Sequence, residues 1–521
     1  IVHINPLPET GTTRFKHPQE FWTWLGAGTK LADLFLQVRI NGDVALLKGL
    51  MKEVLDAEER RPGEVLDHEF ISHYTTGFEE LKASLHQAHV GDILDQSGIK
   101  KTQLEDAARI FIESERVIFC WAMGLTQHKN AVANIQEIVN LMMLRGQLGK
   151  PGSGLCPVRG HSNVQGDRTM GIWEQPTPQF LDSLEEEFGF RPPRQHGYDT
   201  VHAIQAMHEE KAKVFFALGG NFLSATPDTE YTGEALRRCN LTVHVSTKLN
   251  RAHLITGKQA LILPCLGRTE VDRQASGPQL LTTENSMAVV EAWQGRLAPA
   301  SDKLLSEPAI VAGLAKAVLA NRSSVDWDGL VSDYDRIRGC IERVVPDFEN
   351  YNTRVRQPGG FYLPNPIRER KFNTKDGLAH FTVHPLPQID LQPGEFLMMT
   401  MRSHDQFNTT IYGLDDRYRG IRNGRRVVFL NPDDIRLNGF EAGAAVDLIS
   451  SYEGEERIAR HFTIVPYSIP RRCAATYFPE TNVLVPVKYF ADKSHTPASK
   501  SVVISIQPAE GLTTEDTEKK L

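Results

Sequence analysis

The chain has 521 residues, which at roughly 150 residues per domain predicts about three domains. Its hydrophobic content of 40%, charged content of 24% and formal net charge of -7 are typical of a soluble globular protein and argue against a surface that binds nucleic acid. Charged residues interrupt every apolar run before the ~18 positions that a membrane-spanning helix needs, so we expect neither a nucleic-acid partner nor membrane insertion.

The first region, residues 1–155, alternates short apolar runs with longer stretches of helical periodicity. "IVHIN" and "RVIFCWAMG" predict strands, whereas "DVALLKGLMKEVL" places its leucines on one face of a helix. The second region, residues 156–320, repeats the alternation, with strands at "AKVFFALGG", "LTVHVST" and "QALILPC" and a helix at "GEALRRC". Strands separated by helices predict α/β architecture with parallel sheets in both regions.

Residues 321–395 are irregular, with a mixture of Pro, Gly and charge at "QPGGFYLPNPIRERKF", and we expect a connecting segment without a core of its own. From 396 to 510 the pattern changes to short alternating strands: "FLMMTMR", "RRVVFLNPDD", "AVDLISSYEG", "RHFTIVPYS", "TNVLVPVKY" and "SVVISIQP". These strands predict a β-barrel or sandwich. The polar tail, 511–521, is expected to fray.

Six cysteines lie far apart in the sequence and form no C-x-x-C pair: Cys120, Cys156, Cys239, Cys265, Cys340 and Cys473. Scattered thiols are typical of a reducing compartment, so we expect a cytoplasmic protein in which no cysteine of this sequence ligates a metal. The chain begins with the strand-like "IVHINPLPE" rather than with Met, and we expect the natural protein to continue upstream.

Polar, amide-rich segments follow five predicted strands in turn. They are "NPLPE", "MGLTQHKN", "GGNFLSATPD", "STKLNRAH" and "CLGRTEVD". Ligands of open parallel sheets lie beyond the carboxyl ends of the strands, so the five segments together predict a large polar ligand, although each alone reads as a polar turn. The glycines of "LGGNF" lack the spacing of a nicotinamide-binding turn.

Long dispersed motifs resemble the molybdopterin oxidoreductases of the DMSO reductase superfamily, most closely their formate-dehydrogenase-like branch. The similarity runs through residues 120–171 and through "LGGNFLSATPD", "STKLNRAHL", "LILPCLGRTEVD" and "TMRSHDQFNTTIYGLDDRYRG". The resemblance implies a molybdenum or tungsten ion held by two pterin guanine dinucleotides. It also implies two Rossmann-like α/β domains, 1–155 and 156–320, that each bind one dinucleotide, and a C-terminal β-barrel of the double-psi type over 396–510.

The resemblance also assigns residues that bind the cofactor. In the first α/β region these are Asn5, Pro6, Asn41, Asp43, Met123 and Gln127; in the second, Gly160, Asn221, Ser246, Thr247 and Thr269; and in the barrel, Arg402, His404, Asn408, Thr409, Thr410, Asn482 and Lys500. Thr247 stands where the family commonly has an acidic residue. A carboxylate such as that of Asp43 can accept both N–H groups of a guanine edge, although Asp43 also reads as a helix N-cap.

The glycine-rich stretch "GLCPVRGHSNVQGDRTMGI", residues 154–172, matches the family segment that passes under the metal. The resemblance makes Arg159 the catalytic arginine, and the planar fork of a guanidinium suits a small carboxylate such as formate. An ion pair or a phosphate contact is the alternative role for Arg159. His161 stands where formate dehydrogenases have glutamine and is a second catalytic candidate, able to move a proton near neutral pH.

These features predict two-electron oxidation of formate or a similar small substrate, with electrons passed to a carrier protein or subunit. Reduction of a small oxyanion, or a cofactor-bearing protein without activity, are the alternatives. The resemblance places the metal ligand and the cysteines of a 4Fe-4S cluster in an N-terminal part that precedes Ile1, so no metal ligand is expected in this chain.

Overall fold

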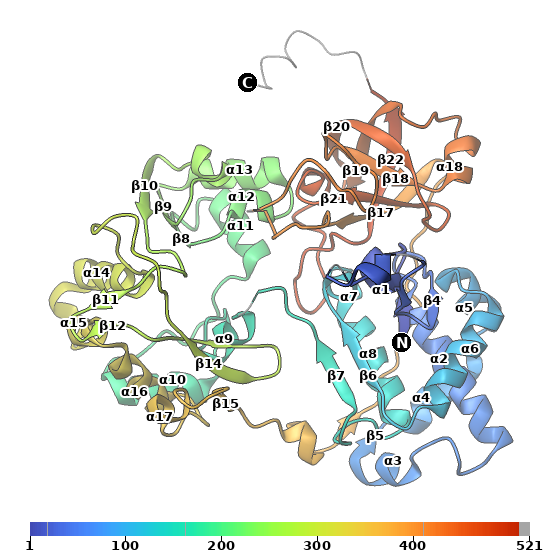
Figure 1. Cartoon of the computed structure of the whole chain (residues 1–521), viewed down its shortest axis with the longest axis horizontal. Helices are drawn as coiled ribbons and strands as arrows, with labels where there is room; N and C mark the ends of the chain where they lie inside the picture. Colours follow the sequence, from blue (N-terminus) through green and yellow to red (C-terminus); the bar gives the residue numbers. More distant parts are fainter. Residues whose placement is uncertain (18, 25, 162, 410, 510–521) are drawn as a thin grey trace. The chain divides into compact units, whose positions relative to one another are not determined.

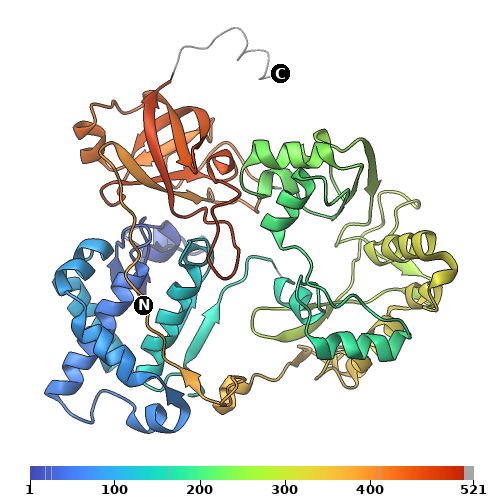
Figure 2. The same cartoon turned by 180° about the vertical axis from the view of Figure 1, so that it is seen from behind.

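The computed structural model describes residues 1–17, 19–24, 26–161, 163–409 and 411–509 (Figures 1 and 2). The chain forms two compact units. Unit 1 comprises Ile1–Leu155, Ser224–Glu230 and the residues from Pro366 onward, and unit 2 comprises Cys156–Leu223 and Tyr231–Asn365. Every helix in the described part of the chain is too short or too polar to cross a lipid bilayer.

The N-terminal part of unit 1 is built from short strands and helices. They are β1 (Val2–Ile4), α1 (Thr10–Thr13), β2 (Arg14–Phe15), β3 (Thr29–Lys30), β4 (Leu34–Leu36), α2 (Asp43–Arg60), α3 (His68–Tyr74), β5 (Thr75–Thr76), α4 (Phe78–Gln87), α5 (Val90–Ser97), α6 (Lys101–Glu113), β6 (Ile118–Trp121), α7 (Met123–Thr126), α8 (Ala131–Leu144) and β7 (Gly154–Pro157). The predicted strands at "IVHIN" and "RVIFCWAMG" and the predicted helix α2 are confirmed.

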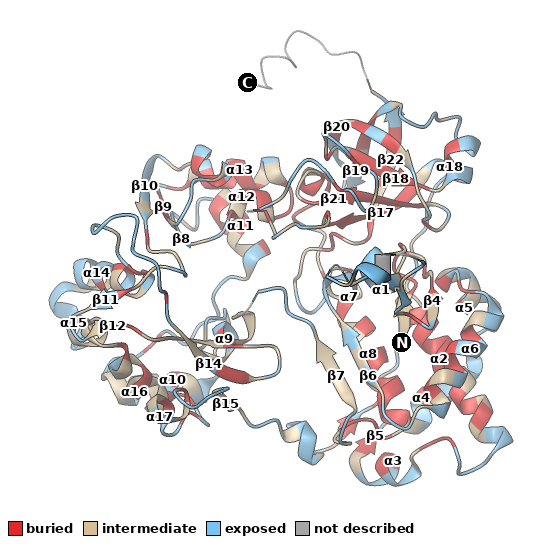
Figure 3. Cartoon of the chain, viewed as in Figure 1, coloured by how far each residue is buried: buried red, intermediate tan, exposed pale blue. Residues whose placement is uncertain are grey.

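Parallel pairing and helix packing define this α/β part. Strand β1 runs parallel to β4, with Val2 opposite Leu34. Helix α2 buries Leu46, Leu47, Leu50 and Leu55, as its leucine spacing predicts, and it packs with α6 and α8 around one apolar core. Figure 3 shows the buried residues concentrated on the facing sides of these helices. The core therefore fixes the loops that follow β1, β4 and β6.

Unit 2 contains a three-stranded sheet of order β10-β9-β8, parallel throughout. Its elements are α9 (Val164–Thr169), α10 (Pro178–Phe188), α11 (Thr200–His208), β8 (Val214–Leu218), α12 (Phe222–Ala225), α13 (Thr229–Arg238), β9 (Leu241–Ser246), β10 (Gln259–Pro264), β11 (Arg273–Gln274), β12 (Gly277–Pro278), β13 (Leu281–Glu284), β14 (Val289–Trp293), α14 (Glu307–Leu319), α15 (Trp327–Ser332), α16 (Tyr334–Val344), α17 (Tyr351–Arg354) and β15 (Phe361–Tyr362). The three strands and the helix predicted for this region are confirmed.

The predicted connecting segment, 321–395, differs from the structure in its first half. Helices α15, α16 and α17 lie there, and Phe348, Tyr351 and Val355 are buried in an apolar cluster with Val290. Residues up to Asn365 therefore belong to unit 2. The sequence disguises this core because its apolar residues are separated by charged residues on the exposed sides of short helices.

The C-terminal part of unit 1 is a closed six-stranded barrel of order β17-β21-β18-β20-β19-β22. Its elements are β17 (Glu395–Met401), β18 (Val427–Leu430), α18 (Pro432–Leu437), β19 (Ala445–Tyr452), β20 (Glu455–Pro466), β21 (Cys473–Tyr477) and β22 (Val502–Pro508), preceded by β16 (Ala379–His380). The pairs β17–β21 and β18–β20 are parallel, and the other neighbours are antiparallel. The predicted fold class, mixed α/β with parallel sheets plus a barrel, is confirmed.

One barrel strand was predicted in the wrong place. "TNVLVPVKY" contains a short 3-10 turn at Asn482–Leu484 instead of a strand, and β21 supplies the sixth strand. Every residue of β21 is buried, so its sequence, CAATY, has no alternation of apolar and polar residues to reveal it. Leu484, Val485 and Val487 are buried without belonging to a strand.

Candidate functional site

A cavity of about 950 Å³ lies within unit 1. Its walls come from five segments: the loop after β1, the start of α2, strand β6, the loop that precedes α8, and barrel strand β17. Leucines of α2 and Met399 and Met401 of β17 make much of the lining apolar. The volume is in the range of cavities that bind large cofactors.

Four polar residues are among those that line this cavity: Asn5, Asp43, His128 and Lys500. Burial raises the pKa of the Asp43 carboxyl to about 7. Burial also lowers the pKa of His128 to about 4, and burial with a smaller effect of Arg402 lowers the pKa of Lys500 to about 7. Charged groups with such displaced pKa values are typical of ligand sites.

Three buried polar atoms without a partner belong to a lining residue, His128, or to residues next in sequence to lining residues, Asn41 and Thr400. Asn41 Oδ1, His128 Nδ1 and Thr400 Oγ1 are buried and have no hydrogen-bond partner in the part of the chain that the structure describes. The other imidazole nitrogen, Nε2 of His128, donates to the carbonyl of Gly124 at 2.7 Å, which leaves Nδ1 as an acceptor. Buried polar atoms are normally paired, so the acceptor His128 Nδ1 in the cavity lining fits a ligand that carries an N–H donor.

Some of the residues predicted for the first region line this cavity and others do not. Asn5, Pro6 and Asp43 line the cavity, and Asn41 adopts a left-handed turn (φ 63°) directly before α2. Gln127 adjoins Lys500, because its carbonyl accepts from the Lys500 backbone N–H at 3.0 Å. Met123 begins α7 and is exposed. Sequence reasoning missed His128, although it lies in the quoted motif "MGLTQHKN".

The barrel residues form a second polar group. Arg402 is half-buried with its guanidinium 3.9 Å from the ring centroid of Phe478, and Nη2 lies 3.5 Å from Asn408 Oδ1. His404 Nδ1 lies 2.9 Å from Asp416 Oδ1. Thr409 is buried, and Thr410 lies outside the described residues.

Asn482 is already engaged with the protein. Its buried Nδ2 donates to the carbonyls of Ser224 at 2.7 Å and Thr226 at 3.2 Å. The nearby ion pair of Arg457 Nε with Asp228 Oδ2, at 2.8 Å, holds the same segment. The structure therefore gives Asn482 a packing role within unit 1.

In unit 2, the predicted residues lie at the carboxyl ends of the parallel strands. Asn221 follows β8, Ser246 ends β9 and is followed by Thr247, and Thr269 follows β10. Because neighbouring parallel strands end at the same edge, these segments share one edge of the sheet. Asn250, which sequence reasoning missed, joins two of the segments by donating from Nδ2 to the Gly220 carbonyl at 2.9 Å.

Arg159, Gly160 and His161 lie in the loop after β7 and are exposed. Arg159 forms no ion pair within the described residues; its backbone N–H donates to Ser286 Oγ at 3.3 Å, and Nη2 lies 3.4 Å from Gln165 Oε1. A guanidinium without a carboxylate partner is available to bind an anion.

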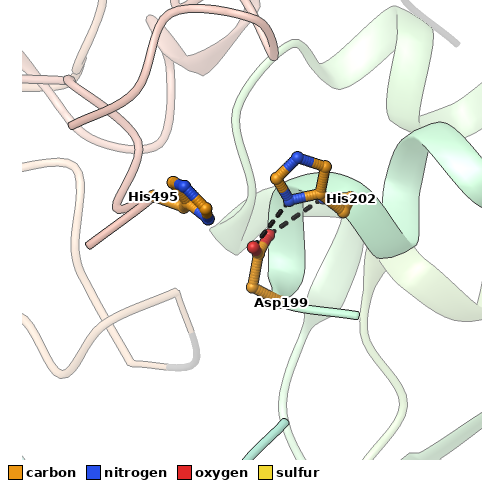
Figure 4. A group of neighbouring side chains, drawn as sticks. All are labelled: Asp199, His202 and His495. Atoms are coloured by element: carbon orange, nitrogen blue, oxygen red, sulfur yellow. Dashed lines mark hydrogen bonds and ion pairs between the residues drawn. The ribbon is translucent and has the colours of Figure 1, made fainter. Parts of the chain in front are cut away.

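A further polar pair in unit 2, Asp199 and His202, is shown in Figure 4. Asp199 caps helix α11 by accepting from the His202 backbone N–H at 3.0 Å, and its other oxygen lies 2.6 Å from Nδ1 of the same histidine. The first contact is a helix cap, and the second is a pair between side chains three positions apart on the same helix.

Comparison with known proteins gives a family. Residues 27–255 match the family model described as "Molybdopterin oxidoreductase". The chain is 50% identical over 514 residues to "Uncharacterized oxidoreductase Rv2900c" of Mycobacterium tuberculosis, covering 98% of this chain and 66% of that protein. It is 43% identical over 521 residues to "Protein YdeP" of Escherichia coli O6:H1, covering 98% and 68%.

Two more distant similarities follow. "F420-dependent formate dehydrogenase 1 subunit alpha" of Methanococcus maripaludis is 30% identical over 220 residues, covering 41% of this chain and 32% of that protein. Among solved structures, the acetylene hydratase of Pelobacter acetylenicus superposes with a TM-score of 0.60 at 16% identity, covering 92% of this chain and 72% of that one. The chain spans about two thirds of the length of the mycobacterial relative.

Proposed function

Because the chain belongs to the molybdopterin oxidoreductases of the DMSO reductase superfamily, we propose that it carries the cofactor-binding part of a two-electron redox enzyme. The proposed cofactor is molybdenum or tungsten held by two molybdopterin guanine dinucleotides. The upstream part of the protein supplies the metal ligand and a 4Fe-4S cluster. The redox partner is an electron-carrier protein or subunit in the cytoplasm.

The buried polar groups in and next to the lining of the unit 1 cavity are the observation that carries this proposal. Asp43 and the unsatisfied Asn41 Oδ1 and His128 Nδ1 are acceptors for the N–H groups of guanine and pterin rings. The ammonium group of Lys500, together with Arg402 of the barrel, suits a phosphate or an anionic pterin group. One dinucleotide is therefore assigned to unit 1.

The second dinucleotide is assigned to the strand ends of unit 2. Gly219 and Gly220 follow β8 with φ of 73° and 77°, and open space surrounds the position where each Cβ would lie. Backbone N–H groups, the Asn221 amide and the Ser246 and Thr247 hydroxyls suit a pyrophosphate and ribose that approach the backbone closely.

Formate is the substrate that Arg159 favours. Oxidation of formate breaks its C–H bond and yields carbon dioxide, one proton and two electrons. When bound, the metal–pterin group supplies the acceptor for the two electrons. Arg159 binds both oxygens of the carboxylate and so directs the C–H bond, and His161, two residues away, accepts the proton.

The same two residues support a second candidate, reduction of a small oxyanion, because a guanidinium fork binds planar oxyanions as well as carboxylates. A protein that holds the cofactor without turning over a substrate is the third candidate. Formate-dependent dye reduction by the metal-loaded whole protein separates them. Turnover of formate that falls in Arg159→Lys supports the first candidate. Oxyanion-dependent oxidation of a reduced dye without formate turnover supports the second, and inactivity towards both supports the third.

A further inference from the structure

Strands β1 and β6 of unit 1 each have one open edge. In the part of the chain that the structure describes, β1 pairs with β4 alone and β6 pairs with β7 alone (Figure 1). The N–H of Asn5, directly after β1, donates to the Leu36 carbonyl of β4 at 3.1 Å. Successive residues of a strand direct their backbone groups to opposite edges, so Val2 and Ile4 direct theirs away from β4.

The same alternation applies to β6. The carbonyl of Val117, directly before β6, accepts from the N–H of Gly154 of β7 at 2.9 Å. The backbone N–H and carbonyl of Ile118 therefore point to the other edge, away from β7. The Ile118 side chain is 60% exposed although it is apolar, so this strand lacks apolar cover as well as a second neighbour.

Both open edges border the cavity of about 950 Å³ in unit 1. The cavity contacts every residue of 1–6 and every residue of 116–122. Successive side chains of a strand point to opposite faces of its sheet. A cavity that touches each residue in turn therefore runs along the edge of the strand rather than over one face.

The two strands point in the same direction, because the loops that follow them reach the same barrel strand. Leu7, after β1, belongs to one apolar cluster with Met399 of β17. Gln127, after β6, accepts at Oε1 from Ser499 Oγ at 2.8 Å, and the Ser499 carbonyl accepts from the N–H of Thr400 of β17 at 3.0 Å. A strand between β1 and β6 can therefore lie parallel to both.

The lining beside these edges is mainly apolar and belongs to the core. Helices α2, α6 and α8 contribute Leu46, Leu47, Leu50, Phe111 and Leu141. Protein interiors are close-packed, so a slot among core leucines requires an apolar occupant. The charged pyrophosphate of a dinucleotide does not suit such a lining, because burial of a charge without a partner is costly.

We propose that one β-strand of apolar residues, from the part of the protein outside this sequence, inserts between β1 and β6 and joins them in one parallel sheet. About a third of the mycobacterial relative lies outside its match to this chain, which is long enough to supply the strand. The end of this sequence, "LTTEDTEKKL", has no apolar run. Addition of a strand gives backbone hydrogen bonds at both open edges, and its alternate side chains fill the slot.

This strand leaves room for a cofactor beyond its carboxyl end. Asn5 follows β1 and His128 follows β6, so both lie past the ends of the strands that the insertion joins. The inference goes beyond the proposed function and does not depend on it, because the open edges and the apolar slot require an occupant whether or not a cofactor is bound.

Amide hydrogen exchange of the whole wild-type protein, in its cofactor-free form, tests the insertion. The N–H groups of His3 and Phe119 point to β4 and β7 and serve as internal controls. We expect the N–H groups of Ile4 and Ile118, at the open edges, to exchange as slowly as these controls. Faster exchange of Ile4 and Ile118 than of His3 and Phe119 overturns the proposal.

Photo-crosslinking identifies the occupant. Ile118 is replaced by p-benzoylphenylalanine in the cofactor-free whole protein, and the linked peptides are sequenced after irradiation. We expect a peptide from outside residues 1–521. The same group at Leu437 of α18, which is 65% exposed and does not line the cavity, should not capture that peptide. Links only to residues 1–521, in the same chain or in a second copy, overturn the proposal, and so does the absence of a link. Guanine content of the wild type tests the proposed function separately.

Discussion

At the scale of single residues, substitution of Arg159 tests the proposed formate chemistry most sharply. Arg159→Lys keeps the positive charge and removes the planar fork, so the carboxylate is no longer held by two parallel hydrogen bonds. Displacement of a reacting bond by about an ångström can cost about 100-fold in rate. We expect a loss of that order in kcat/KM for formate with unchanged metal content. Arg168→Lys, an exposed arginine of the same stretch, is the control. An unchanged rate in Arg159→Lys removes Arg159 from the mechanism.

The raised pKa of Asp43 predicts how the stability of the folded chain depends on pH. Its pKa is raised to about 7 in the folded chain, so the folded state keeps a proton that the unfolded state has already released. The stabilising effect is complete below the unfolded pKa of about 3.9 and is lost as the pH rises through 7. In cofactor-free protein, Asp43→Asn should therefore raise Tm at pH 8 and have little effect near pH 4. Thermal unfolding at both pH values checks this. A lower Tm at pH 8, or an equal gain in the exposed control Asp92→Asn, would show that burial does not disfavour the ionised form of Asp43.

Sequence reasoning reached some site residues and not others for a physical reason. Asn5 and Asp43 follow a strand or begin a helix, and strand ends reveal such positions. Glu9 and Asp416 lie in quoted segments, but their contacts could not be predicted, because their partners include residues far away in sequence: Glu9 and Arg419 are 410 positions apart.

At the scale of secondary-structure elements, helices α2 and α8 are joined by a buried ion pair. Lys48 Nζ lies 3.1 Å from Glu137 Oε1, and both side chains are almost fully buried. Lys48→Met leaves the Glu137 carboxylate without its cation, which should cost about 3–5 kcal/mol of unfolding free energy. The double variant Lys48→Met/Glu137→Met removes both charges and should recover most of that loss. Urea denaturation of the wild type, Lys48→Met and the double variant measures the three unfolding free energies. A double variant as unstable as Lys48→Met would contradict it.

The sequence pattern predicted some strands and missed others. Strands with one exposed face, such as β20, show alternation and were predicted, as were the parallel strands β8, β9 and β10 between their helices. Strand β21 is buried on both faces and consists mainly of small residues, so its pattern carries no information on pairing. Its place in the barrel depends on contacts with β17 and β18.

At the scale of the whole molecule, the absence of closely spaced cysteines predicts that the metal ligand lies outside this part of the protein. Cys156 is the cysteine nearest in sequence to Arg159. We expect Cys156→Ser in the whole protein to retain its full molybdenum or tungsten content, measured by mass spectrometry of the metals. Loss of the metal in this variant would show that the metal ligand lies within this part of the sequence, contrary to the prediction.

The central claim is that the two units each hold one pterin guanine dinucleotide. Metal and guanine content of the purified whole protein tests it most directly, with Lys500→Met and Asp43→Ala as variants that each remove one polar group from the lining of the unit 1 cavity. We expect about one molybdenum or tungsten and two guanine nucleotides per wild-type chain, as two dinucleotides per metal require, and less guanine in both variants when they remain folded. Folded, active wild-type protein without guanine would contradict it.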